Sequence, residues 1–155
     1  AQLEKHFGAR GKLLRAPTRL SLGAARNLAA SSSAGEYVMF MDDDNVAKPG
    51  EVRQLARAAL ATGAGILAPA NDYLQGNRAP IKGQPSRGRW YPMGGSLAVG
   101  FFKDCFGDSN ALVKREVLDD VGGFAAQLQL GGLDSTGEDW EFFAAAVLAG
   151  HRLLA

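Results

Sequence analysis

The pattern of apolar and polar residues along the chain predicts alternating strands and helices. Residues 37–41 (YVMFM) are apolar without alternation, which is typical of a strand buried on both faces of a sheet. Further strands are predicted over 65–68, 96–102 and 110–113, and helices over 24–33, 49–63, 115–121 and 135–150. This order favours an α/β fold whose mostly parallel sheet is flanked by helices.

Glycine, proline and hydroxyl residues mark the expected helix ends. Gly35 suits a left-handed cap after the first helix, and Pro49 suits the first turn of the second. Gly122 should stop the third helix. The last helix begins with two overlapping capping boxes, in which Ser135 precedes Glu138 and Thr136 precedes Asp139 by three residues.

One long segment, residues 69–95, has no hydrophobic period and is rich in glycine and proline. Loops of this length in compact domains are usually functional or disordered. The segment is therefore either a solvated flexible loop or a lid. In a lid, cations such as Arg87 and Arg89 would meet an anionic ligand.

Length and charge limit the classes of protein. The 155 residues predict about one domain, residues 1–155. A net charge of +1, from 17 basic and 16 acidic side chains, argues against recruitment by nucleic acid or a membrane surface. No apolar run approaches the ~18 residues of a membrane-spanning helix. Cys105 is the single cysteine, which fits a reducing compartment. We expect a cytoplasmic protein, or one held peripherally at the inner membrane face.

Three consecutive carboxylates, Asp42, Asp43 and Asp44, follow the apolar strand of residues 37–41. The carboxyl edge of an α/β sheet is where ligands of such folds bind. Hard oxygen ligands there select Mg²⁺ or Mn²⁺, and such an ion would bind further oxygens, typically those of phosphates. The alternative is a turn that only caps the following helix.

Four motifs resemble those of the GT-A glycosyltransferases of family 2, which use nucleotide sugars. They are GAARN at 23–27, AGEYVMFMDDDN at 34–45, VGGF at 121–124 and GEDW at 137–140. Each motif is weak alone, but the four stand in the family's order and at similar spacing. The resemblance covers residues 14–154 and implies a Rossmann-like GT-A sheet.

The resemblance also implies a role for each residue that matches the donor site. Asp42 and Asp44 match the D-x-D motif, so they would hold Mn²⁺ or Mg²⁺, with Asp44 binding the metal on the diphosphate. Asp43 matches a ribose contact, and Arg26 an arginine that in some relatives reaches the nucleobase. The implied donor is a UDP-, GDP- or dTDP-sugar.

The last matching motif implies the catalytic base of an inverting transfer. Asp139 would deprotonate an acceptor hydroxyl of a glycan, lipid or small molecule. Its neighbour Glu138 is a candidate contact to acceptor or diphosphate, and Trp140, Arg87, Arg89 and Asp108 are further candidates. The alternative for Glu138 and Asp139 is helix capping without chemistry.

Parts of the family's usual domain have no counterpart in this sequence. The N-terminal βαβ part, which holds much of the base and ribose, and the C-terminal end are expected to be missing. We therefore expect a fragment that self-associates and is inactive alone. Two other functions stay open: a D-x-D phosphatase or phosphotransferase with Asp42 as nucleophile and Asp44 as acid/base, and a non-catalytic nucleotide-sugar-binding module.

Overall fold

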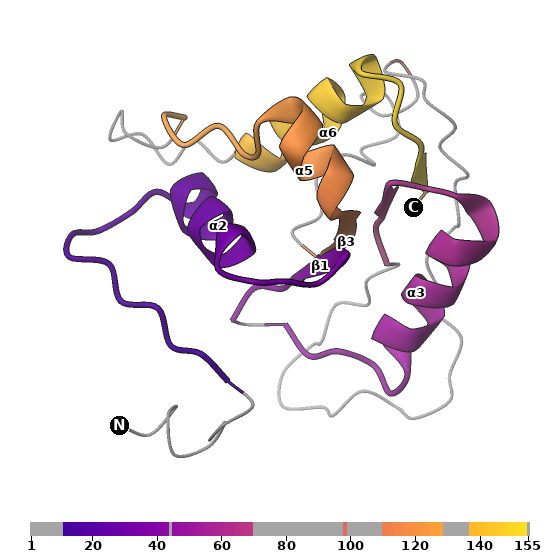
Figure 1. Ribbon diagram of the computed structural model, residues 1–155, viewed down its shortest axis with the longest axis horizontal. Coiled ribbons are helices and arrows are strands. Elements are labelled where there is room, and N and C mark those ends of the chain that lie inside the picture. The colour runs from indigo at the N-terminus through magenta and orange to yellow at the C-terminus, as the bar shows by residue number, and fades with distance from the viewer. Residues whose placement is uncertain (1–10, 44, 70–97, 99–109, 129–136, 155) are drawn as a thin grey trace.

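The computed structural model describes residues 11–43, 45–69, 98, 110–128 and 137–154 (Figure 1). Several sequence predictions concern residues outside these ranges. They are most of the 69–95 loop, the 96–102 strand except for residue 98, and the individual residues Asp44, Arg87, Arg89, Cys105, Asp108, Ser135 and Thr136.

The described strands form one four-stranded sheet in the order β1-β3-β2-β4. Their bounds are Tyr37–Phe40 (β1), Ile66–Leu67 (β2), Ala111–Lys114 (β3) and Leu153–Leu154 (β4). Strand β3 is antiparallel to both β1 and β2, whereas β4 is parallel to β2. Consequently β1, β2 and β4 share one direction and only the inserted β3 opposes them. The sheet expected to be mostly parallel is thus mixed, as many α/β sheets are.

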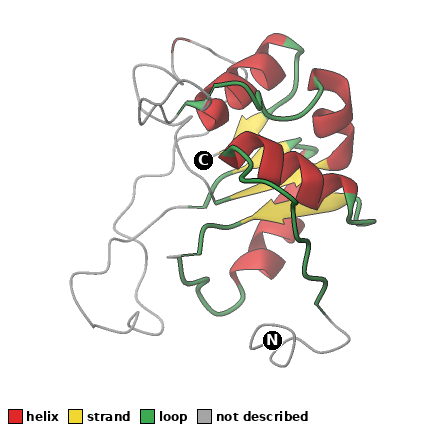
Figure 2. Cartoon of the chain, turned by 90° about the vertical axis from the view of Figure 1, so that its left-hand side faces the viewer, coloured by secondary structure: helices red, strands yellow, loops and turns green. Residues whose placement is uncertain are grey.

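Helices cover both faces of this sheet, as Figures 1 and 2 show. They are α2 (Leu22–Ser31), α3 (Glu51–Thr62), α5 (Arg115–Val121) and α6 (Glu138–Leu148). Helices α2, α5 and α6 contribute to one buried cluster, and α3 contributes to the other. Side chains of β1 alternate between the two clusters, with Val38 and Phe40 in the first and Tyr37 and Met39 in the second. The prediction that this strand is covered on both faces is confirmed.

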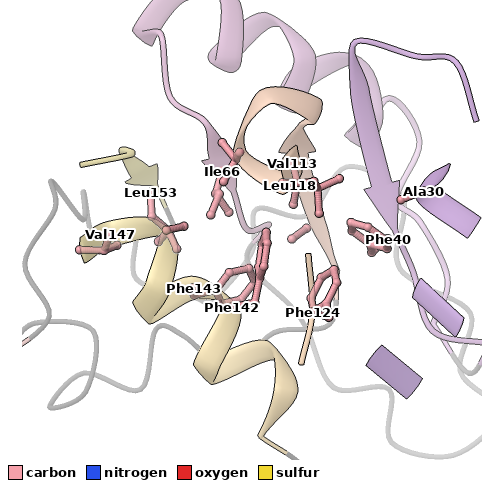
Figure 3. Close-up of a cluster of buried hydrophobic side chains, with 13 residues drawn as sticks. Ala30, Phe40, Ile66, Val113, Leu118, Phe124, Phe142, Phe143, Val147 and Leu153 are labelled. Carbon is pink, nitrogen blue, oxygen red and sulfur yellow. The ribbon is translucent and has the colours of Figure 1, made fainter. Parts of the chain in front are cut away.

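The larger cluster is centred on aromatic rings (Figure 3). The rings of Phe124 and Phe142 stack with centroids 4.3 Å apart, and Phe40 meets Phe124 edge-on at 5.0 Å. Helix α6 presents Phe142, Phe143 and Val147 to the sheet, whereas Leu148, its last residue, is 72% exposed. The aromatic ring of Phe124 thus links the segment after α5 to both β1 and α6.

Helix α2 differs from its predicted bounds at both ends. It starts at Leu22 because the side chain of Ser21 caps it, with Ser21 Oγ accepting from Ala24 N at 3.2 Å. It ends at Ser31 with Ser32 as the C-cap, so the prediction that Gly35 caps it was wrong. At Gly35 the chain instead folds closely, and a Cβ would lie 2.9 Å from the Tyr37 carbonyl oxygen.

Of the other helix ends, the C-terminal glycine caps are as predicted, whereas the starts of α3 and α6 are not. Gly63 and Gly122 end α3 and α5 in the left-handed conformation, as expected for C-caps. Pro49 lies outside α3, whose N-cap is Gly50. Helix α6 begins at Glu138 after the N-cap Gly137, three residues later than predicted.

Candidate functional site

The acidic turn follows β1 at the edge of the sheet where the strands sharing its direction also end. Asp42 and Asp43 follow the strand after one intervening residue, Met41, and the Asn45 amide donates to the Asp42 carbonyl oxygen at 3.3 Å. The Asp42 side chain is 34% exposed and Asp43 is exposed. Both carboxylates are therefore accessible from solvent at this edge of the sheet.

Arg26 of α2 connects this turn to the start of α6. Its Nη1 donates to Glu138 Oε1 at 2.8 Å, and its Nη2 donates to Asp42 Oδ1 at 3.4 Å. The guanidinium carbon also lies 5.2 Å from the centroid of the Phe124 ring. Arg26 and Glu138 are both buried. One cation thus contacts the acidic residues of two motifs that are far apart in the sequence.

Asp139 stands beside this ion pair, at the first turn of α6. Its Oδ1 accepts a hydrogen bond from Trp140 N at 2.8 Å. Burial of the half-buried carboxyl raises the pKa of Asp139 above its usual value, and the nearby charge of Glu138 raises it further. The hydrogen bond from Trp140 and the charge of Arg26 act on this pKa in the opposite direction. An aspartate with a raised pKa is a better proton acceptor than an ordinary one.

Asn27 fixes α2 against the glycine turn that follows α5. Its Nδ2 donates to the Phe124 carbonyl oxygen and its Oδ1 accepts from the Phe124 amide, both at 2.8 Å. Gly123 has φ +79°, and a Cβ there would lie 2.6 Å from Asn27 Oδ1. Gly23 is close to the same segment, since its Cβ would meet the Ala125 carbonyl oxygen at 3.0 Å. Residues of the GAARN and VGGF motifs therefore pack directly against each other.

The structure brings together most of the predicted site residues that it describes. Arg26, Asp42 and Glu138 meet directly, Asp139 adjoins them, and Trp140 packs against the aromatic cluster. Sequence reasoning missed the Arg26–Glu138 pair and the Asn27 contacts. The available signal was that one motif contains a basic residue and another contains acidic residues. This signal does not specify which of several carboxylates the arginine contacts.

The acidic turn has the donor atoms that a hard divalent cation requires. Only one Asp42 oxygen contacts Arg26, and that contact is long, so the carboxylate can still serve as a ligand. Within the described ranges, no three histidine, cysteine or acidic side chains come together as a metal-binding group. The chemistry of Asp42 and Asp43 nevertheless fits Mg²⁺ or Mn²⁺.

A surface hollow lies at the opposite end of β1, away from these residues. Its lining is strongly charged: Glu36, Lys114, Arg115, Glu116, Asp119, Asp120 and His151. Lys114 pairs with Glu116, and His151 Nε2 lies 2.8 Å from Asp120 Oδ2. Because four carboxylates face two full cations and one histidine, the lining of this hollow is net acidic.

Comparison with solved structures defines the class of fold. The crystal structure of residues 1–349 of TarS from S. aureus matches with a TM-score of 0.57 at 19% sequence identity. The match covers 85% of this chain and 36% of that one, so the chain spans about a third of the length of the crystallised TarS piece. At this identity the likeness shows the fold alone, which is the α/β GT-A fold.

The sequence itself identifies the family. The model for glycosyl transferase family 2 matches residues 1–122, most of the chain. The chain belongs to this family. The match contains the GAARN and DDD motifs and ends before Glu138 and Asp139. A comparison with curated proteins gave no match. Within the part of the chain that the structure describes, no helix is long and apolar enough to cross a membrane.

Proposed function

We propose that this chain carries the donor-binding and catalytic groups of an inverting, metal-dependent glycosyltransferase, which moves a sugar from a nucleotide sugar to an acceptor hydroxyl. The observation that supports this most is the meeting of the two acidic motifs at Arg26. The motif after β1 supplies carboxylates for a metal and diphosphate. The motif at the start of α6 supplies a carboxylate for proton removal.

Asp139 is the proposed general base. It takes the proton of the acceptor hydroxyl, whose oxygen then attacks the anomeric carbon of the donor sugar. The bond from that carbon to the diphosphate breaks, and the nucleoside diphosphate leaves with the electron pair. A single displacement from the opposite side inverts the anomeric configuration. The raised pKa of Asp139, caused mainly by burial, suits a group that must accept a proton.

Asp42 and Asp44 are the proposed ligands of a Mn²⁺ or Mg²⁺ ion. When bound, this ion would stabilise the negative charge that develops on the departing diphosphate. Asp43, which is exposed beside Asp42, is the proposed ribose contact. The proposed donor is a UDP-, GDP- or dTDP-sugar, and the acceptor is a glycan, a lipid or a small molecule. The alternative of an aspartyl phosphatase gains no support from the family match.

The test starts from binding and ends with turnover. A thermal-shift screen of the full-length protein should compare nucleoside diphosphates and nucleotide sugars, each with and without Mn²⁺, because ligand binding raises stability by mass action. We expect one nucleotide class to stabilise the protein only with metal. The matching nucleotide sugar should then release nucleoside diphosphate when acceptor is added. Metal-dependent binding without release would instead indicate a non-catalytic binding module, and no binding by any nucleotide would refute the proposal.

A further inference from the structure

The two carboxylates that contact Arg26 hold it unequally. The Glu138 side chain is 3% exposed and makes a 2.8 Å contact, whereas Asp42 is 34% exposed and its contact is 3.4 Å. Charge-assisted hydrogen bonds of full strength are about 2.7–2.9 Å long. A buried carboxylate needs a cationic partner, so Glu138 determines where the guanidinium lies. Asp42 is then a secondary, looser partner that is still open to solvent.

The helix that carries Arg26 is itself held in place. Asn27, the next residue, makes two hydrogen bonds to the backbone of Phe124, and Ser21 Oγ donates to the Ala126 carbonyl oxygen at 2.7 Å. The Phe124 ring lies under the guanidinium. The position of Arg26 is therefore determined from below by Phe124, along its helix by Asn27, and at its tip by Glu138.

We propose that Arg26 is a positioning residue. Held by Glu138, it keeps the Asp42 turn and the start of α6 in a fixed relation, so that the diphosphate-binding carboxylates and Asp139 face the same donor. This inference rests on the proposed function. It gives Arg26 a different role from the nucleobase contact that the family resemblance implies, since a side chain only 7% exposed is poorly placed to meet a base.

The conservative variant Arg26→Lys tests the geometry while keeping the charge. A lysine ammonium is a point charge on a flexible stem and lacks the planar fork that contacts Glu138 and Asp42 together. A displacement of about 1 Å between reacting groups can lower the rate ~100-fold. We expect Arg26→Lys and Glu138→Gln each to lower kcat by roughly 10–100-fold while the donor KM changes less than about threefold.

The control is Glu141→Gln, which removes another carboxylate from the first turn of α6, where Glu141 is exposed. It should leave kcat and KM unchanged. An equal fall in kcat in this control would mean that general charge near α6, not positioning, explains the result. A higher donor KM at normal kcat in Arg26→Lys alone would assign Arg26 to the donor. A lower Tm with unchanged kcat and KM in the two test variants would leave only a structural role.

A second measurement needs no turnover. Asp42→Asn, Glu138→Gln and the double variant are compared in thermal unfolding without ligand. If Arg26 links the two carboxylates, the Tm shifts of the single variants will not add up to that of the double variant. Additive shifts would overturn the positioning role even in an active transferase. Non-additive shifts in a protein that transfers no sugar would refute the proposed function and leave the Arg26 linkage standing.

Discussion

Replacing Asp139 by Asn separates catalysis from helix structure. The asparagine side chain keeps an oxygen that can accept the 2.8 Å hydrogen bond from Trp140 N, so the first turn of α6 should be preserved. It removes the ionised carboxylate that, in the proposed mechanism, accepts the proton of the acceptor hydroxyl. Loss of a positioned general base typically lowers turnover by about 10²- to 10⁴-fold. We expect a loss of this size with an unchanged affinity for the donor.

The same substitution should not lower stability at neutral pH. The pKa of Asp139 is raised in the folded state, mainly by burial, so the folded protein binds this proton more tightly than the unfolded chain does. The resulting stabilisation is fully present below the ordinary aspartate pKa of about 4 and is lost as pH rises through the folded-state pKa. Asparagine never ionises, so at neutral pH Asp139→Asn should be at least as stable as the parent protein.

Two measurements on the full-length protein test this reasoning. The first is the release of nucleoside diphosphate in steady-state kinetics across pH, in which kcat/KM of the parent should fall in acid with a midpoint above that of an ordinary aspartate. The second is thermal unfolding at pH 7 and pH 4, with the exposed Asp119→Asn as control. Near-normal turnover in Asp139→Asn would refute the base assignment. A marked loss of Tm at pH 7 would refute the stability argument.

Three further substitutions test other parts of the structure. Gly123→Ala should destabilise the protein by more than about 1 kcal/mol in urea unfolding, because φ is positive and the added Cβ would also meet Asn27. Gly122→Ala is the control: its φ is positive too, but its Cβ would have nothing within 4 Å, so it should lose less stability. Equal losses of stability in the two variants would contradict the close contact with Asn27. Phe142→Ala should cost about 3–5 kcal/mol by removing a fully buried ring, and a cost below about 1 kcal/mol would contradict its central place in the core. Asp44→Ala should abolish the Mn²⁺-dependent thermal shift with nucleoside diphosphate, and a retained shift would exclude Asp44 as a metal ligand.

Local sequence signals predicted most of the described elements. Helix α5 has the bounds expected from its apolar positions and Gly122, and α3 ends at Gly63 as the glycine cap requires. The predicted strands that became β1, β2 and β3 are all present, although β1 and β2 are shorter than predicted and β3 is shifted by one residue. β4 was missed because two residues are too short to show a period. Helix ends and strand positions depend mainly on residues that are close together in the chain, so a single sequence is enough to predict them.

Longer-range features could not be predicted in the same way. The direction of β3 leaves no mark on its composition, since a buried antiparallel strand and a buried parallel strand are both simply apolar. The sequence motifs predicted Arg26 and Glu138 as candidate site residues, but did not predict their pairing, which joins positions 112 residues apart. Capping by Ser21 was readable in principle, because a serine stands three residues before Ala24, whose amide it binds.

The position of β3 between β1 and β2 has a consequence for how the chain folds during synthesis. Both β1 and β2 leave the ribosome before their shared partner exists, since β3 comes later in the sequence. Neither strand can complete its ladder of hydrogen bonds until Ala111–Lys114 has been made, and β4 can join β2 only afterwards. Pairings of this kind close long loops and therefore form slowly. During that interval the edges of β1 and β2 that face β3 in the described sheet remain unpaired, a condition that favours aggregation of nascent chains.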